Sequence, residues 1–77
     1  MKVGRDPGLC DICLTEPRVS GMHASLKLEA GGLMVRDEGS NNGTYVAGAK
    51  IQSYAWVAVP PEAPVRFGPI EFTVRLE

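Results

Sequence analysis

The sequence predicts an all-β fold, an antiparallel β-sandwich built from about eight short strands. No stretch of ten or more residues repeats its apolar positions with the 3.6-residue period of an amphipathic helix. Short segments instead alternate between apolar and polar residues, and nine glycines and six prolines separate them. Many short strands with a turn signal after each are typical of a sandwich or a barrel.

The first half of the chain contains two alternating segments and a hairpin. Residues 11–14 alternate briefly, and residues 23–29 alternate most clearly. The longer segment is expected to turn Ala24, Leu26 and Leu28 toward the core and its polar residues, Ser25, Lys27 and Glu29, toward solvent. Gly31-Gly32 is expected to form a type I′ turn, because both central positions of that turn require positive φ. Residues 33–37 then form the return strand.

The second half contains a polar turn tract followed by further strands. Residues 38–43 are six consecutive polar or turn-forming residues. Trp56 and the aromatic residues near the C-terminus are assigned to the core. Strands are expected at residues 44–46, 50–51, 56–59, 65–67 and 70–76, with turns at residues 47–49 and at Gly68-Pro69.

Length and charge restrict the functions that this chain can have. Its 77 residues make one domain, which we assign to residues 1–77. A formal net charge of −1 gives no field that attracts nucleic acid or an anionic membrane, so neither is an expected partner. No apolar run approaches the ~18 residues of a membrane span, and no signal-peptide pattern follows Met1, so a cytoplasmic location is expected.

Cys10 and Cys13 have the spacing of a redox pair or of half a zinc site. Zinc would require two further ligands, and His23 is the one histidine. A thioredoxin-like pair begins a helix, whereas Ile12 and Leu14 alternate with Cys13 as they do in a strand. We therefore expect two reduced thiols, no metal or other cofactor and no enzyme activity. An enzyme that uses the two cysteines is the rival hypothesis.

Three polar segments offer groups suited to binding an anion. Residues 4–8, 18–23 and 40–44 together supply a guanidinium, several hydroxyls and two carboxamides. Connections in an antiparallel sandwich gather at its two ends, so segments far apart in sequence converge there. The set lacks a nucleophile with a base and an orienting group, but it contains the donors that a dianionic phosphate binds.

The same three segments resemble the forkhead-associated (FHA) family. The order and spacing of the shared motifs agree from Val3 to the C-terminus, which makes the ordered set specific although a single Gly-Arg or Asn-Gly pair is not. The motifs are Val3-Gly4-Arg5, residues 11–14, Val19-Ser20-x-x-His23-Ala24, Asp37-x-x-Ser40-x-Asn42-Gly43-Thr44-Tyr45-Val46-x-Gly48 and Phe67-Gly68.

The resemblance implies a sandwich whose loops at one end bind phosphothreonine peptides. The expected function is therefore a phosphothreonine-dependent interaction module in Ser/Thr kinase signalling, and Arg-cluster phosphate readers include this family. The resemblance implies that Arg5 and Ser20 hold the phosphate. It also implies that Asn42 bonds the peptide backbone and that Asn41 lies against the phosphate or the ligand. His23 would brace the loops by hydrogen bonds.

Gly21 departs from the family pattern, because many members have Arg, Lys or Asn directly after the loop serine. A side-chain donor is absent there, although the Gly21 backbone N–H remains. Arg18 is expected either to compensate for it or to read an acidic side chain three positions after the phosphothreonine. The open alternative is a degenerate scaffold of the same fold that contacts proteins without phosphate.

The N-terminus is the second departure. The family has a strand or more ahead of the Gly4-Arg5 segment, whereas this sequence begins just before it. We expect the first strand or strands of the complete fold to be lacking, in a fragment, in a compact version, or in a chain that borrows a partner's strand. An unpaired N-terminal edge would favour a dimer or strand exchange.

Overall fold

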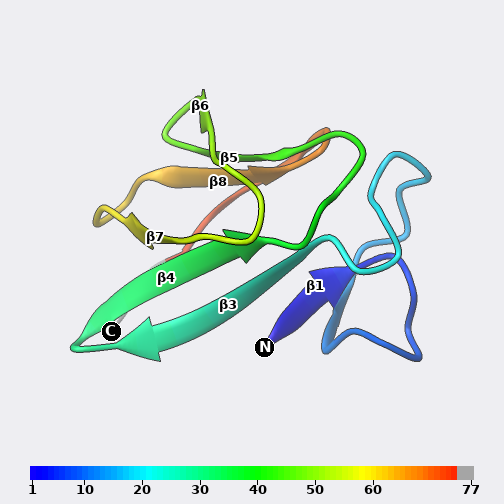
Figure 1. Ribbon diagram of the computed structural model, residues 1–77, viewed down its shortest axis with the longest axis horizontal. Coiled ribbons are helices and arrows are strands. Elements are labelled where there is room, and N and C mark those ends of the chain that lie inside the picture. Colours follow the sequence, from blue (N-terminus) through cyan, green and yellow to red (C-terminus); the bar gives the residue numbers. More distant parts are fainter. Residues whose placement is uncertain (75–77) are drawn as a thin grey trace.

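The computed structural model describes residues 1–74, and two β-sheets packed face to face account for all of the regular structure in this range. Figure 1 shows the two layers, with β5, β6 and β8 in one and β1, β3 and β4 in the other. The predicted all-β sandwich is confirmed. Residues 1–74 include no helix that could cross a membrane. The end of the last expected strand, residues 75 and 76, lies outside the described residues.

The first sheet has five strands in the order β2-β1-β3-β4-β7. All neighbours are antiparallel except β1 and β2, which run parallel. The chain between them returns to the level of Lys2, where the Asp11 N–H donates to the Lys2 carbonyl (3.0 Å), so β2 repeats the direction of β1. The bounds are Lys2–Gly4 for β1, Ile12–Cys13 for β2, Ala24–Glu29 for β3, Gly32–Asp37 for β4 and Trp56–Val59 for β7.

The N-terminal strand β1 is flanked by β2 and β3, so the expectation of an unpaired edge at β1 is wrong. Pairing extends to the first residue: the Met1 ammonium donates to the Leu26 carbonyl (2.8 Å), and the Leu26 N–H donates to the Met1 carbonyl (2.7 Å). Within residues 1–74, the edge strands of this sheet are β2 and β7. The expected dimer or strand exchange stays a prediction, but β1 is not the unpaired edge strand on which that expectation was based.

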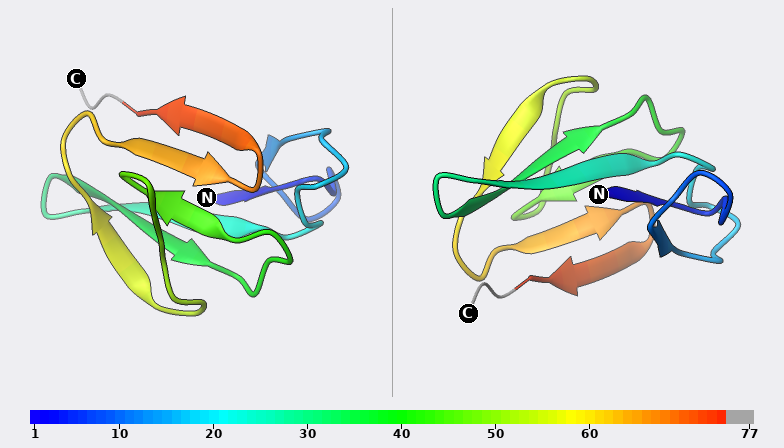
Figure 2. Two further views of the ribbon diagram at one scale, coloured as in Figure 1. Left: turned by 90° about the horizontal axis from the view of Figure 1, so that it is seen from above. Right: turned by 90° about the horizontal axis from the view of Figure 1, so that it is seen from below.

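The second sheet has four antiparallel strands in the order β6-β5-β8-β9. The β5–β6 hairpin turns at Ala47 (φ 50°) and Gly48 (φ 82°), within the predicted segment. Gly68 (φ 56°) and Pro69 form the predicted turn between the last two strands. Figure 2 shows β9, in red, at the outer side of this sheet. The bounds are Thr44–Val46 for β5, Ala49–Lys50 for β6, Pro64–Phe67 for β8 and Ile70–Thr73 for β9.

The β3–β4 hairpin turns one residue earlier than the sequence predicts. Ala30 (φ 52°) and Gly31 (φ 78°) are its central residues, and Glu29 pairs with Gly32. A turn at residues 31 and 32 would instead pair Ala30 with Leu33 and shift the pairing of β4 against β3 by two residues, without moving any side chain to the opposite face. The observed turn places Leu33 opposite Leu28 and Val35 opposite Leu26, although it requires an alanine at positive φ.

The core lies between the sheets and consists largely of small aliphatic residues. Phe67 is buried as predicted, but Trp56 and Phe72 remain 36% and 40% exposed, so their assignment to the core is wrong. Trp56 lies on the outer face of β7, where Lys27 Nζ is 4.2 Å from its ring centroid. Phe72 contacts Phe67 (6.2 Å between centroids) but lies on the edge strand β9. The core residues are Val3, Ala24, Val35, Val46, Val65 and Phe67.

Strand β3 also departs from its expected alternation. Leu28 is 68% exposed because it lies beside the hairpin turn, at the far end of β3 from the buried Ala24. Ser25 is buried although it lies on the outer face, where its hydroxyl donates to Glu38 Oε2 (2.6 Å). The strand is therefore most deeply buried at its beginning, next to the loops at the opposite end of the sandwich from the hairpin.

Candidate functional site

Three loops gather at one end of the sandwich, at the right of Figure 1. They follow β1, precede β3 and connect β4 to β5, and they contain the three polar segments that the sequence singles out. Segments more than twenty residues apart in the sequence are joined here by hydrogen bonds, such as the one from the Asn41 N–H to Ser20 Oγ (3.0 Å), whose partners are 21 residues apart. The end of the sandwich opposite the β3–β4 hairpin is therefore a single polar surface.

Gly4 allows the first two loops to approach each other closely. The Arg5 N–H donates to the Ser20 carbonyl (3.0 Å) and the Asp6 N–H to the Gly21 carbonyl (3.1 Å). A Cβ atom on Gly4 would collide with the Gly21 carbonyl oxygen and lie 2.8 Å from Cys10 Sγ. Glycine is therefore required for this backbone contact, which places Arg5 directly beside the Ser20 loop.

His23 joins the second loop to the third. Its ring is fully buried, and Nδ1 accepts the Ser20 N–H (3.1 Å). This bond fixes the tautomer with the proton on Nε2, which donates to the Gly43 carbonyl (2.8 Å). The ring also packs edge-on against Phe67 (5.9 Å between centroids). The imidazole thus braces two loops, in agreement with the role that the family resemblance implies.

Asp37 organises the third loop, a role that the sequence reasoning missed. Its carboxylate is 2% exposed and accepts hydroxyl groups from Ser40, Thr44 (2.7 Å) and Ser53 (2.8 Å). It also accepts the N–H groups of Gly39 (3.1 Å) and Ser40 (3.2 Å). Burial raises the pKa of Asp37, but these hydrogen bonds outweigh burial and hold that pKa below its usual value. The signal was an acidic residue directly before a tract of turn-forming residues.

Arg5 and Ser20 present unused donors at this end. The Arg5 Nε donates to the Val19 carbonyl (3.1 Å), while no hydrogen bond or ion pair joins its two Nη groups to residues 1–74. The Ser20 oxygen accepts the Asn41 N–H, so its own proton is left to donate outward. The Asp6 carboxylate accepts the Gly8 N–H (2.8 Å) rather than pairing with Arg5.

Asn42 and Arg18 are joined through the Arg18 backbone. The Asn42 Nδ2 donates to the Arg18 carbonyl (2.6 Å), which leaves the Asn42 Oδ1 without a partner in residues 1–74. The Arg18 guanidinium pairs with Glu16 (Nε to Oε1, 2.9 Å). The hydrogen bonds from the Arg18 side chain and then from its N–H lower the pKa of Glu16. Within residues 1–74 the Arg18 guanidinium thus pairs with Glu16, and its expected compensation for Gly21 stays a prediction.

Gly21 contributes its backbone to the site. Its carbonyl accepts the Asp6 N–H and also the Cys10 thiol (Sγ to O, 3.1 Å). Its N–H has no hydrogen-bond partner among the described residues and remains a donor at the loop surface. A Cβ atom added to Gly21 would point toward Asp6 and lie 3.8 Å from the Asp6 Cβ, an ordinary van der Waals contact.

The two cysteines are free thiols that support the loops. Cys10 Sγ donates to Gly21, and Cys13 Sγ donates to the Arg5 carbonyl (3.3 Å). Burial, followed by the nearby Asp6, Cys13 and Asp11, raises the pKa of the Cys10 thiol, so its protonated donor form prevails at neutral pH. No group of three or more His, Cys, Asp or Glu side chains suited to a metal ion occurs in residues 1–74.

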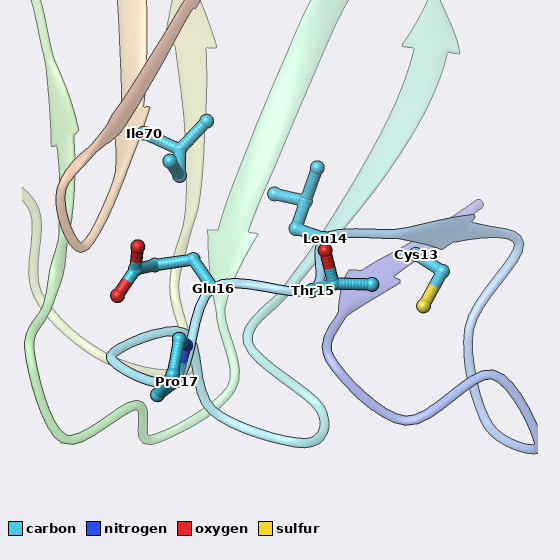
Figure 3. A pocket seen from close by; sticks show the side chains of 6 residues that line it. All are labelled: Cys13, Leu14, Thr15, Glu16, Pro17 and Ile70. Carbon is cyan, nitrogen blue, oxygen red and sulfur yellow. The ribbon is translucent and has the colours of Figure 1, made fainter.

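An open hollow of about 440 Å³ lies beside the loop end, next to Arg18. Figure 3 shows Glu16 extending from its loop toward the side of the hollow on which Ile70 lies. The sequence reasoning gave no role to Glu16, although its spacing from Arg18 is the one signal that could have indicated their pairing. The lining residues are Cys13, Leu14, Thr15, Glu16, Pro17 and Ile70.

The FHA domain family model matches residues 1–68. The chain therefore belongs to the FHA domain family. A curated relative, the chloroplastic zeaxanthin epoxidase of Spinacia oleracea, is 32% identical over 71 residues. The match covers 88% of this chain and 10% of the epoxidase, so the chain spans about a tenth of the length of that relative.

Solved structures of FHA proteins have the same fold. The FHA domain of the CT664 protein from Chlamydia trachomatis is 28% identical and superposes with a TM-score of 0.90, over 99% of this chain and 74% of that one. The EmbR protein of Mycobacterium tuberculosis, solved in complex with a low-affinity phosphopeptide, is also 28% identical, with a TM-score of 0.85 over 96% of this chain and 19% of that one.

Proposed function

We propose that this domain binds protein partners through a phosphothreonine, as an interaction module in Ser/Thr kinase signalling that has no enzymatic activity of its own. One observation carries the proposal: the two Nη groups of Arg5 have no partner among residues 1–74, while its backbone N–H bonds the carbonyl of Ser20, whose hydroxyl oxygen accepts the Asn41 N–H. Membership of the FHA family supports it, as does the phosphopeptide bound by the related EmbR protein.

The donors at the loop end match the acceptors of a phosphate. A phosphothreonine has three acceptor oxygens and about −1.5 to −2 charges at pH 7. Arg5 would donate from both Nη groups, Ser20 from its hydroxyl and Gly21 from its N–H. Each hydrogen bond to a charged group contributes about 1.5–3 kcal/mol. After the ordering costs of the peptide, such a set gives an affinity on the order of micromolar.

The Asn41-Asn42 turn would hold the peptide beside its phosphothreonine. The bond from Asn42 Nδ2 to the Arg18 carbonyl fixes the carboxamide, so Oδ1 can accept a backbone N–H of the peptide without further ordering. The Asn41 N–H donates to Ser20 Oγ, so in this proposal the Asn41 side chain would lie next to the phosphate. A preorganised turn lowers the entropy cost of binding.

The partner in this proposal is a phosphothreonine-bearing protein in the cytoplasm, where Ser/Thr kinases act on soluble proteins. Nucleic acid and membrane are not partners, because the net charge of −1 provides no long-range attraction to polyanions. The epoxidase activity of the Spinacia oleracea relative is not part of the proposal, since the match covers one tenth of that protein.

A titration with matched peptides tests the proposal. A phosphothreonine peptide library is screened, and the best sequence is then measured by fluorescence anisotropy with phosphothreonine, phosphoserine and unmodified threonine. We expect binding of the phosphorylated forms only, and a loss of roughly tenfold to a hundredfold in Arg5→Ala. Lys27→Ala, which removes a cation from the outer face of β3, is the matched control and should bind normally. Equal affinity for the phosphorylated and unmodified peptides would leave a degenerate, phosphate-independent scaffold as the function.

A further inference from the structure

The hollow beside the loop end is linked to the proposed phosphopeptide site by the hydrogen bonds of Arg18. The carbonyl of Arg18 accepts the Asn42 carboxamide N–H (2.6 Å), while its backbone N–H and its Nε both donate to Glu16 Oε1, at 3.2 and 2.9 Å. One residue thus connects the Asn41-Asn42 turn to the wall of the hollow. This link would bring the hollow within reach of a side chain of a peptide bound at that turn.

The lining of the hollow combines apolar walls with one carboxylate. Leu14, Pro17 and Ile70 provide apolar surface, and Glu16 is the charged residue of the lining (Figure 3). Both bonds from Arg18 go to Oε1 of Glu16, and Oε2 accepts no hydrogen bond within residues 1–74. This combination fits a side chain with an aliphatic stem and a cationic end, since such side chains cover apolar surface while their charge reaches a polar group.

We propose that this hollow is a second subsite of the phosphopeptide site and that it takes a lysine or arginine side chain close to the phosphothreonine. The inference rests on the proposed function. It differs from the sequence-based expectation that Arg18 selects an acidic side chain, because Arg18 is already paired with Glu16, and Glu16 rather than Arg18 lines the hollow. An acidic peptide side chain would meet the Glu16 carboxylate, and like charges in contact select against a partner.

The solvent exposure of the Arg18–Glu16 ion pair sets how strongly the hollow can discriminate between charged peptide side chains. The side chains of Arg18 and Glu16 are 68% and 26% exposed, so solvent and salt screen their charges. Ion pairs of this kind change an equilibrium by about two- to fivefold, not by orders of magnitude. The subsite therefore selects among phosphopeptides, whereas the phosphate contacts at Arg5 decide whether a peptide binds.

The test uses phosphothreonine peptides that differ at one position only. Each position within four residues of the phosphothreonine is scanned with Lys, Gln and Glu, and dissociation constants are measured by calorimetry with the full 77-residue chain. We expect one position at which Lys binds about two- to fivefold more tightly than Glu, a preference that high salt reduces. In Glu16→Gln the preference at this position should reverse, because Arg18 is released to meet an acidic side chain.

Glu29→Gln is the matched control, since Glu29 is an exposed, ion-paired carboxylate beside the β3–β4 turn, at the other end of the sandwich. It should keep the wild-type preference. A preference for Glu in the wild type, or a Lys-to-Glu ratio that Glu16→Gln leaves unchanged, overturns the subsite while the phosphate dependence stands. If the phosphorylated and unmodified peptides bind equally, the proposed function and the subsite both fall.

Discussion

Strands β3 and β4 have two ends that are stabilised in different ways. At the loop end, His23 and Asp37 are buried polar residues whose hydrogen bonds connect separate segments of the chain. At the hairpin end, Leu28 is 68% exposed and the Lys27–Glu29 ion pair lies at the surface. Buried side-chain hydrogen bonds are concentrated at the loop end, where we place the ligand. At the hairpin end, a two-residue turn connects β3 to β4.

The difference explains how a small domain can present loops with a defined shape. A buried polar network fixes one geometry when every member is satisfied, and it is costly when one partner is removed. Between them, His23 and Asp37 hold loops that contain Ser20, Asn41 and Asn42. The comparison predicts that substitutions at the loop end lower stability and affinity together, whereas substitutions at the hairpin end change neither.

The largest effect on stability is expected from His23→Ala. The substitution opens a cavity next to Phe67 and leaves the Ser20 N–H and the Gly43 carbonyl without their buried partner. We expect the free energy of unfolding to fall by about 3 kcal/mol, as measured by urea denaturation. A fall of less than about 0.5 kcal/mol, the size of an ordinary surface substitution, would show that His23 does not hold the loops together.

A smaller loss is expected from Asp37→Asn, which keeps the shape of the side chain but removes its charge. The amide nitrogen would replace a carboxylate oxygen that accepts hydroxyl and N–H donors. Urea denaturation should show a loss of about 2 kcal/mol, because bonds to a charged acceptor weaken and one donor faces another. Unchanged stability, or a turn at residues 39–43 with wild-type amide chemical shifts, would remove Asp37 from its organising role.

The stability of the wild type and that of Asp37→Asn should depend differently on pH. The folded-state pKa of Asp37 is lowered, so its contribution is fully present above the unfolded-state pKa of about 3.9 and is lost as the pH falls through the folded-state value. Unfolding free energies measured from pH 7 to pH 2 should therefore converge for wild type and Asp37→Asn as the pH falls. Curves that stay parallel over this range would contradict the assignment.

The smallest effect is expected at the hairpin end. Leu28→Ser replaces a side chain that is largely in water, so the free energy of unfolding should change by less than about 0.5 kcal/mol. The affinity for a phosphothreonine peptide should also remain that of the wild type. A loss comparable to that of Asp37→Asn in either measurement would show that the two ends are coupled, and the comparison that separates them would be wrong.

The sequence predicts the fold class and the gathering of the three loops, because alternation and turn residues are local signals. It fails where long-range contacts decide. The pairing of β3 with β4 centres the hairpin turn on Ala30 and Gly31, and the outward position of Trp56 depends on which face of β7 meets the core. The parallel pairing of β1 with β2 likewise depends on a loop path that no local pattern specifies.

The candidate site divides in the same way. Motif spacing identifies Arg5, Ser20, Asn41 and Asn42, and their binding roles stay predictions until a ligand is measured. It does not reveal that Asp37 accepts five hydrogen bonds or that Glu16 pairs with Arg18, because both depend on which donors the folded loops bring together. Hydrogen-bond partners within a loop cluster are a property of the fold, whereas donor types are a property of the sequence.

The most direct test of the central claim is a two-dimensional NMR titration of the ¹⁵N-labelled domain with a phosphothreonine peptide and with its unphosphorylated twin. We expect the phosphopeptide to shift the amide signals of Arg5, Ser20, Gly21 and the Asn41-Asn42 turn, and the unphosphorylated twin to leave them in place. Identical shifts with both peptides, or shifts confined to the outer face around Lys27 and Trp56, would contradict that claim.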